Sequence, residues 1–253
     1  MLLTGKNAIV YGAAGRIGAA MSTAFAREGA KVHLTGRTAK TLDALADKIR
    51  ANGGRAETAV VDALDEDAVN AHADTVAEND GSVDISVCVI DIADHQGTPL
   101  AEMALEAFER PISLAVRSTF VTARAAARHM IRQRSGVILT FGGDGGGEPM
   151  RDYSIGGLQV ALNAVDFLRR QLAAELGQHG IRVLGLHSGG IAEGLPADLK
   201  AAPVITDMLV AKTMLKRTAT FADVGNVAVF AASDLAASMT SASLNITCGA
   251  VSD

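Results

Sequence analysis

The chain has 253 residues and a formal net charge of −5, and 49% of its residues are hydrophobic although only 4% are aromatic. This length suffices for one large α/β domain with an aliphatic core, and the negative charge argues against nucleic acid or an anionic membrane as a partner. Its two cysteines are too few for a disulfide framework, and no apolar run reaches the roughly 20 residues that cross a bilayer, so we expect a cytoplasmic protein.

Short apolar, β-branched runs alternate with longer segments of helical spacing along the whole chain. This alternation predicts a parallel sheet with helices on both faces. Neither a linker nor a repeat divides the sequence, so we predict a single domain over residues 1–253. In chain order, the expected strands are residues 7–11, 31–34, 56–61, 85–90, 136–141, 181–186 and 244–247, and the expected helices are residues 16–28, 38–52, 65–78, 103–133, 156–178 and 221–235.

A glycine-rich loop follows the first expected strand and opens the first expected helix. Gly12, Gly15 and Gly18 let the chain turn tightly and let backbone N–H groups approach a pyrophosphate, to which the helix N-terminus adds partial positive charge. Such a glycine pattern is weak by itself, and its place between strand and helix strengthens it. Arg16, inside the loop, could either crowd the phosphates or bind one of them.

The second expected strand ends at Gly36-Arg37-Thr38. Arg37 suits the 2′-phosphate of NADP, because arginine binds phosphate through paired, charge-assisted hydrogen bonds. The alternative is an ordinary solvated arginine at a strand end. Between the two nucleotides, the sequence favours NADP over NAD.

Residues 192–213 interrupt the alternation of strands and helices, with Pro196 and Pro203 inside a mixed apolar and charged segment. In an open α/β sheet, insertions after strand ends lie above the ligand crevice. This segment is therefore either a lid over a substrate or an ordinary surface excursion.

Taken together, these features resemble the short-chain dehydrogenase/reductase family, and the resemblance covers the whole chain. It implies a doubly wound Rossmann-type domain with a seven-stranded, mostly parallel sheet in the order 3-2-1-4-5-6-7. It also implies NAD(P)-dependent oxidation or reduction of an alcohol or carbonyl, and assembly into tetramers or dimers. The segments that carry it are LTGKNAIV (3–10), YGAAGRIG (11–18), LAAEL (172–176), HGIRV (179–183), FAASD (230–234) and LNITCG (244–249).

The resemblance also implies a set of cofactor-binding residues. The family's glycine loop reads T-G-x-x-x-G-x-G, so Tyr11 replaces the threonine and Arg16 replaces the middle glycine. NAD-preferring relatives carry an acid where this chain has Gly36, and Asp62 matches the residue that faces the adenine. The full set is Gly12, Ala14, Gly15, Arg16, Ile17, Gly18, Gly36, Arg37, Thr38, Asp62, Ala63, Val89, Ile90 and Ile191.

The chain departs from the family at its catalytic tetrad of Asn, Ser, Tyr and Lys. The corresponding positions read Ala115, Gly143, Leu158 and Leu162, none of which can donate a proton. A shifted alignment does not restore the lysine, because none occurs between residues 48 and 200. General acid–base catalysis contributes typically ~10²–10⁴ in rate, so we do not expect the family's usual mechanism.

Another side chain could supply the proton instead. Tyr153 is the best candidate, because a phenol is the family's acid, and Asp144 lies in the same loop. Further candidates follow the fourth and sixth expected strands. They are Asp91, Asp94, His95 and His187, and each could instead be a solvated loop residue or, for His187, a hydrogen-bonded core histidine.

Three hypotheses about function remain open on the sequence. The first is an NADP-dependent oxidoreductase with an atypical proton relay. The second is a non-catalytic relative that binds a dinucleotide as a sensor, and the third is a silent subunit that assembles with itself or with an active homologue. Apolar side chains on several faces of the expected helix 156–178 indicate either burial against another subunit or a helix tightly enclosed within one domain. We expect no metal site, because the six histidines are scattered along the sequence.

Overall fold

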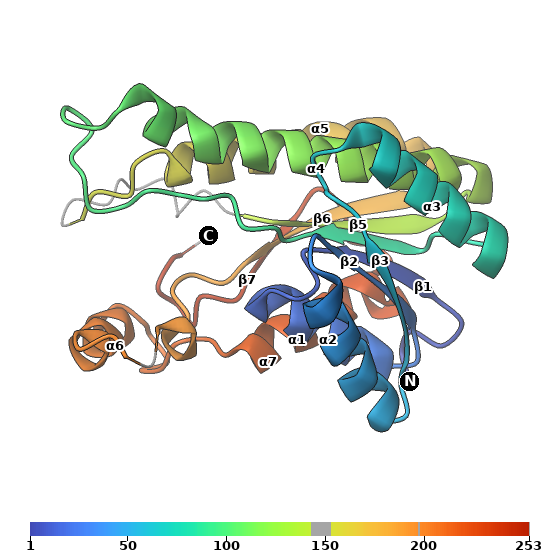
Figure 1. The fold of residues 1–253 in the computed structure, drawn as a ribbon, viewed down its shortest axis with the longest axis horizontal. Coiled ribbons are helices and arrows are strands. Elements are labelled where there is room, and N and C mark those ends of the chain that lie inside the picture. The colour runs from blue at the N-terminus through green and yellow to red at the C-terminus, as the bar shows by residue number, and fades with distance from the viewer. Residues whose placement is uncertain (143–152, 197, 253) are drawn as a thin grey trace.

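Seven parallel strands form one sheet in the order β3-β2-β1-β4-β5-β6-β7, in a computed structural model that describes residues 1–142, 153–196 and 198–252 (Figure 1). This order and the helices on both faces confirm the Rossmann-type fold class, with a sheet whose strand pairs are all parallel. The strands are β1 (Asn7–Tyr11), β2 (Lys31–Gly36), β3 (Arg55–Val60), β4 (Ile85–Cys88), β5 (Gly136–Phe141), β6 (Ile181–His187) and β7 (Ser243–Asn245).

Helices cover both faces of the sheet. On one face, α1, α2 and α7 bury a core with Ala8 and Val10 of β1, and on the other α3, α4 and α5 bury a second core with Ile9 and Tyr11 (Figure 1). Alternate residues of β1 thus enter opposite cores, as a strand buried on both faces requires. The helices are α1 (Arg16–Arg27), α2 (Ala39–Ala51), α3 (Glu66–Asp80), α4 (Leu105–Gln133), α5 (Leu158–Leu176), α6 (Ala202–Ala211) and α7 (Phe221–Ala232), with short 3₁₀ turns η2 (Gly177–His179), η3 (Ala192–Gly194) and η4 (Asp234–Ala236).

Many predicted boundaries shift by one to three residues, and three differences bear on the candidate site. The strand expected over residues 85–90 ends at Cys88. The helix expected over residues 156–178 begins at Leu158, because Gly156 has a φ of +56° and an added Cβ there would lie 2.5 Å from the carbonyl oxygen of His95. The segment 192–213 is not wholly irregular, since it contains η3 and α6. In the described part of the chain, no helix combines the length and apolar character needed to cross a membrane.

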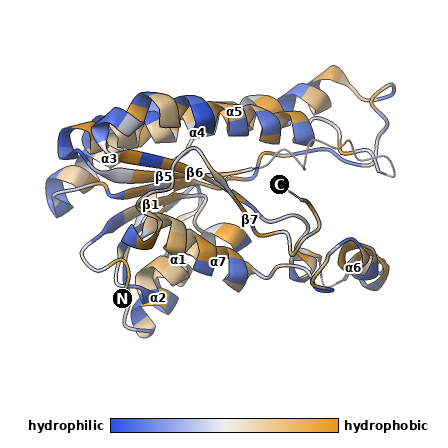
Figure 2. Ribbon diagram, turned by 180° about the vertical axis from the view of Figure 1, so that it is seen from behind, coloured by the Kyte–Doolittle hydropathy of each residue, from blue (hydrophilic) through white to orange (hydrophobic). Residues whose placement is uncertain are grey.

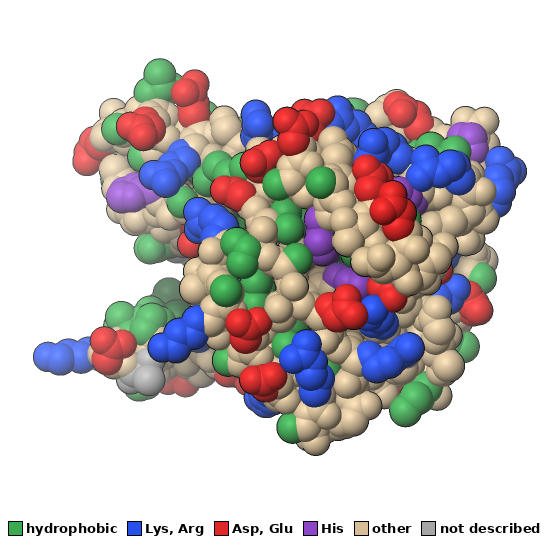
Figure 3. Space-filling view, turned by 45° about the vertical axis from the view of Figure 1, so that its right-hand side comes forward, with side chains coloured by type: hydrophobic (Ala, Val, Ile, Leu, Met, Phe, Trp, Pro, Cys, Tyr) green, Lys and Arg blue, Asp and Glu red, His purple; other side chains and the backbone are tan. Residues whose placement is uncertain are grey.

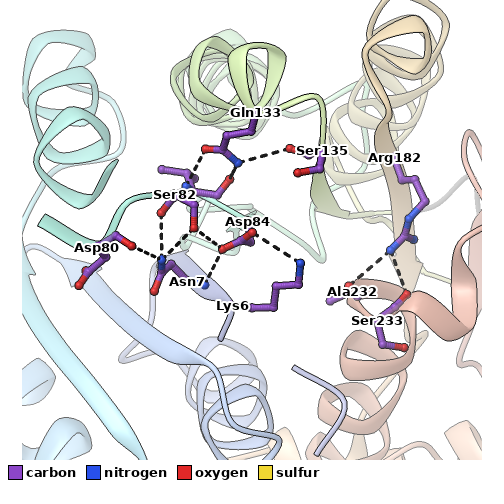
Figure 4. A network of polar contacts seen from close by, with 11 residues as sticks. Lys6, Asn7, Asp80, Ser82, Asp84, Gln133, Ser135, Arg182, Ala232 and Ser233 are labelled. Atoms are coloured by element: carbon purple, nitrogen blue, oxygen red, sulfur yellow. Dashed lines mark hydrogen bonds and ion pairs between the residues drawn. The ribbon is translucent and has the colours of Figure 1, made fainter. Parts of the chain in front are cut away.

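A polar network closes the amino-terminal edge of the sheet (Figure 4). Asn7 is 7% exposed, and its Nδ2 donates to the carbonyl oxygen of Asp80 at 3.2 Å and to Oγ of Ser82 at 3.0 Å. Its backbone N–H donates to Oδ2 of Asp84 at 2.9 Å. Gln133 at the end of α4 bonds both backbone groups of Val83 at 3.0 Å. This edge is therefore tied together by side chains, which leaves the carboxyl edge for a ligand.

Candidate functional site

The glycine loop lies at the carboxyl edge, between the ends of β1 and β4. Gly12 has a φ of +79°, and an added Cβ there would lie 2.6 Å from the carbonyl oxygen of Val89. A Cβ on Gly18 would overlap the carbonyl oxygen of Gly12. Only glycine permits this left-handed turn and these close backbone contacts. The loop consequently delivers the chain into α1 directly above the sheet edge.

The first turn of α1 has the features of an anion site. Its N-cap is Gly15, which provides no side-chain cap, and the first turn carries no acidic residue. The first N–H groups of a helix lack partners within the helix and sit at the positive end of its dipole. A phosphate placed here would be bound by these N–H groups.

Arg37 and Thr38 extend the site beyond the end of β2. Both are exposed, and Thr38, the N-cap of α2, makes no side-chain capping bond. Within the described ranges, no carboxylate forms an ion pair with Arg37. Its guanidinium is therefore accessible to a phosphate from solvent.

The other expected cofactor residues also lie at strand ends along this edge. Asp62 and Ala63 follow β3, and Oδ1 of Asp62 accepts from the backbone N–H of Leu64 at 3.0 Å. Val89 follows β4, and its N–H donates to the carbonyl oxygen of Tyr11 at 2.9 Å. Ile90 and Ile191 are half-buried residues that pack against the two cores. The structure thus brings the predicted set to one edge, while their role toward a nucleotide remains a prediction.

The side chain of Arg16 extends from the start of α1 to the segment that follows β6. Its Nη1 donates to the carbonyl oxygens of Gly194 and, at 3.4 Å, of Glu193. These two residues belong to η3, which follows β6. The side chain that replaces the family's middle glycine therefore connects the glycine loop to the segment after the sixth strand.

Aliphatic side chains fill the place where the resemblance puts the catalytic tetrad. Ala115, Ala161 and Val165 are 5%, 0% and 2% exposed and pack with Ile92 and Ile112. We call these five residues the apolar cluster. It lies beside the end of β5, so among the described residues this part of the edge offers aliphatic side chains.

Two of the tetrad positions can be placed next to that cluster. An added Cβ on Gly142, at the end of β5, would lie 3.7 Å from both Leu162 Cδ2 and Val165 Cγ1. Leu158 begins α5 one turn earlier and is half-buried. Gly143 and Asp144, the remaining tetrad position and one candidate donor, lie outside the described residues.

The other candidate donors make local contacts. Tyr153 is 51% exposed, and its hydroxyl lies 3.6 Å from the point where a Cβ on Gly97 would be. Asp91 Oδ1 accepts from the N–H of Ala93 at 2.8 Å, and His95 Nε2 lies 3.0 Å from Thr98 Oγ1. Asp94 bonds Gln96, and His187 ends β6 opposite Asn245 of β7. Tyr153 thus lies beside the loop around Gly97, and the N–H of Gly97 donates to the carbonyl oxygen of Ser154 at 2.7 Å.

Sequence reasoning missed a polar cluster between β2, β3 and the end of α3. Lys31 Nζ lies 2.6 Å from Asp80 Oδ1 and 2.7 Å from Glu57 Oε1, and Nε2 of the buried His33 lies 3.0 Å from Asp80 Oδ2. The ligand atoms of His33, Glu57 and Asp80 lie within 4.8 Å of one another. Because the ammonium of Lys31 already stands between the two carboxylates, we interpret the group as an ion-pair network.

The fold brings together two histidines that are far apart in the sequence. The rings of His33 and His72 are 6.2 Å apart at their centroids, and that of His72 lies 6.4 Å from Tyr11. Burial, followed by His33, lowers the pKa of His72 to about 4. Burial also lowers the pKa of His33, against Asp80 and Glu57. The parallel pairing of β2 with β3 sets His33 opposite Glu57. A predicted register for these two strands could therefore have found part of the polar cluster.

Comparisons with known proteins agree with the fold. The profile of a family described as enoyl-(acyl carrier protein) reductase matches residues 12–250. Gluconate 5-dehydrogenase of Gluconobacter oxydans (strain 621H) is 31% identical over 231 residues, covering 91% of this chain and 89% of that protein. Cis-4-hydroxycyclohexanecarboxylate dehydrogenase of Sinomonas cyclohexanicum is 32% identical over 245 residues, covering 95% and 94%. The crystal structure of a short-chain type dehydrogenase/reductase from Mycobacterium marinum superposes with a TM-score of 0.87 at 28% identity, covering 99% of this chain and 97% of that one.

Proposed function

The chain belongs to the short-chain dehydrogenase/reductase family, and on that premise we propose that it is an NAD(P)-dependent oxidoreductase of a carbonyl or alcohol. The observation that carries the proposal is the uncapped start of α1 directly after the glycine loop. Backbone N–H groups there suit a pyrophosphate, and the residues at the ends of β2 and β3 extend along the same edge for the rest of a dinucleotide. The nicotinamide, when bound, supplies or accepts the hydride.

NADP(H) is the favoured nucleotide. The exposed Arg37 follows Gly36, and no acid stands at Gly36 to bind the ribose hydroxyls of NAD. A 2′-phosphate would bring two negative charges to an arginine that has no carboxylate partner among the described residues, and arginine binds phosphate in a paired geometry.

The proton must come from outside the tetrad positions. The apolar cluster and Leu162 would exclude water from the reacting end of the site but cannot exchange a proton there. Tyr153 is the leading candidate, and its hydroxyl lies beside Gly97, in the segment that follows β4.

Binding without turnover is the second candidate function, and the apolar cluster favours it. A chain that binds the nucleotide with no proton relay would act as a dinucleotide sensor or as a silent subunit. The family usually forms oligomers, and α4 and α5 leave Phe120, Val160 and Phe167 43%, 46% and 71% exposed. These side chains offer apolar surface to a second copy or to an active homologue.

A fluorescence titration with NADPH, with NADH as the control, tests the nucleotide site. Selective binding of NADPH at micromolar concentration would support the proposal and justify a screen of carbonyl and alcohol substrates. Failure to bind either nucleotide at millimolar concentration would remove both the oxidoreductase and the sensor, leaving assembly.

Where turnover is found, Tyr153→Phe tests the proton relay. We expect at least a hundredfold loss in kcat with the dissociation constant for NADPH unchanged, since a general acid contributes about 10²–10⁴ in rate. Unchanged kcat would exclude Tyr153 as the acid. NADPH binding with no turnover in the substrate screen would favour the sensor or silent subunit.

A further inference from the structure

Arg16 touches two parts of the molecule that a ligand would have to bridge. It is the first residue of α1, at the expected pyrophosphate site, and its Nη1 donates to the carbonyl oxygens of Glu193 and Gly194. We call η3 (Ala192–Gly194) the lid base, because it connects β6 to the segment that contains α6.

The lid base is held to the body of the protein by a small number of contacts. The N–H of Ala192 donates to Oγ1 of Thr218 at 3.3 Å. The carboxylate of Glu193 accepts from the N–H of Phe221, the first residue of α7. Arg16 is the contact that comes from the glycine loop.

Beyond the base, α6 is only loosely attached. None of its residues is buried, and Val204 and Met208 are 63% and 56% exposed, although the helix is largely apolar. Figures 1 and 2 show it standing off from the sheet, and Figure 3 shows the surface deeply notched on that side. Leu209 is one point where α6 comes near the body, because a Cβ added to Gly190 would lie 2.5 Å from its Cδ2. The contacts of the lid base therefore have a large influence on where α6 sits.

The guanidinium of Arg16 has donors to spare. Nη1 holds the lid base, while Nε and Nη2 make no hydrogen bond to any described residue. A guanidinium presents five N–H donors in a rigid fork and can bind two partners at once. A phosphate at the start of α1 would neutralise Arg16 and fix its position.

We propose that Arg16 is a positioning residue that ties the lid base to the bound dinucleotide, so that nucleotide binding reduces opening of the lid. This inference rests on the proposed nucleotide site. It gives the residue that replaces the family's middle glycine a specific role. In the free protein the guanidinium of Arg16 bonds only the lid base, and in the complex it would bond both the lid base and the pyrophosphate.

Limited trypsin digestion tests the proposal, because Lys200 and Lys212 lie exposed on either side of α6. The cleavage rate at these two sites, normalised to a cut at Arg134, is followed by mass spectrometry with and without saturating NADPH. Arg16→Gln removes the charge and the fork but keeps a good helix former. Arg27→Gln is the matched control, since Arg27 lies at the other end of α1 and bonds Asn226 in place of the lid base.

We expect Arg16→Gln to raise lid cleavage in the free protein by about three- to tenfold, as loss of a charge-assisted hydrogen bond at an exposed site implies. NADPH should slow lid cleavage in the wild type and in Arg27→Gln by a similar factor, but not in Arg16→Gln at its own saturating concentration. Equal cleavage of the free wild type and Arg16→Gln, or equal protection of both by NADPH, overturns the proposal. If the wild type does not bind NADPH in the fluorescence titration, both the proposed function and the effect of NADPH on the lid are excluded. The cleavage rates of the free wild type and free Arg16→Gln still test whether Arg16 holds the lid base.

Discussion

Arg37 is the side chain on which the choice of nucleotide rests. Replacing it by alanine should weaken NADPH binding by about 10- to 100-fold, since a hydrogen bond to a charged group contributes roughly 1.5–3 kcal/mol. NADH lacks the 2′-phosphate, so its dissociation constant should change less than twofold. Parallel fluorescence titrations of the variant measure both values. An equal loss for the two nucleotides would mean that Arg37 does not read the 2′-phosphate.

His72 makes the stability of the protein depend on pH. Its pKa is about 4 in the folded chain, against 6.5 for an ordinary histidine, because of burial and then His33. Between these two values the unfolded chain binds more protons, so the free energy of unfolding is fully retained above about pH 6.5 and falls as the pH drops toward 4. His33 acts in the same direction.

Urea unfolding of the wild type and of His72→Gln between pH 4 and 8 measures this effect. The wild type should lose stability on acidification, with one proton corresponding to about 1.4 kcal/mol per pH unit. The variant should show a shallower decline in that window and the same pH dependence above pH 7. A variant with an identical slope below pH 6.5 would show that His72 is not responsible.

Helix α5 carries Leu158 and Leu162, the two positions at which the family resemblance puts the catalytic tyrosine and lysine. Leu162→Lys restores the residue type that the resemblance puts at this position, but places an ammonium beside Gly142 and Val165. We expect a loss of roughly 1–3 kcal/mol in stability, the cost of a polar group in apolar surroundings, and no gain in turnover. Leu162→Met is the control, because it keeps the volume. Denaturant unfolding gives the comparison, and a fully stable lysine variant would contradict an apolar site.

The central strands were predictable from the sequence because β1, β4 and β5 are short, largely apolar runs. Helix α6 was not predicted, since Pro196 and Pro203 read as breakers of regular structure. The structure places Pro203 at the start of α6, where its missing N–H has no helical partner to lose. The polar cluster was also missed, because Lys31, His33, Glu57 and Asp80 come from three elements that only the sheet brings together.

At the scale of the whole molecule, the exposed apolar side chains of α4 and α5 predict self-association. We expect light scattering to show a dimer or tetramer, and Phe167→Asp to shift it toward a monomer, because Phe167 is 71% exposed and a charge there opposes burial. Leu235→Asp is the control, because Leu235 is 66% exposed in η4 and does not lie on α4 or α5. A wild type that is monomeric at tens of micromolar would contradict the prediction.

The order of the sheet could be predicted because consecutive βαβ units cross over with one hand and the resemblance supplies the point of reversal. The donor of a proton could not be predicted in this way. Residue type identifies what Leu158 and Leu162 cannot do, whereas the position of Tyr153 relative to Gly97 depends on how two loops pack. The fold could therefore be predicted from the sequence pattern, whereas the group that donates the proton could not.

The tight packing of Gly12 and Gly18 affects what the presence of these glycines says about nucleotide binding. A side chain at either position would collide with backbone inside the protein itself, so purifying selection for folding alone would keep both glycines in a lineage that had long abandoned nucleotides. The two glycines alone therefore do not show whether the present chain binds a nucleotide. Arg16 and Arg37 are exposed and free of that steric constraint. Substitutions at these two positions in orthologues would therefore indicate the loss of a nucleotide better than changes at the glycines.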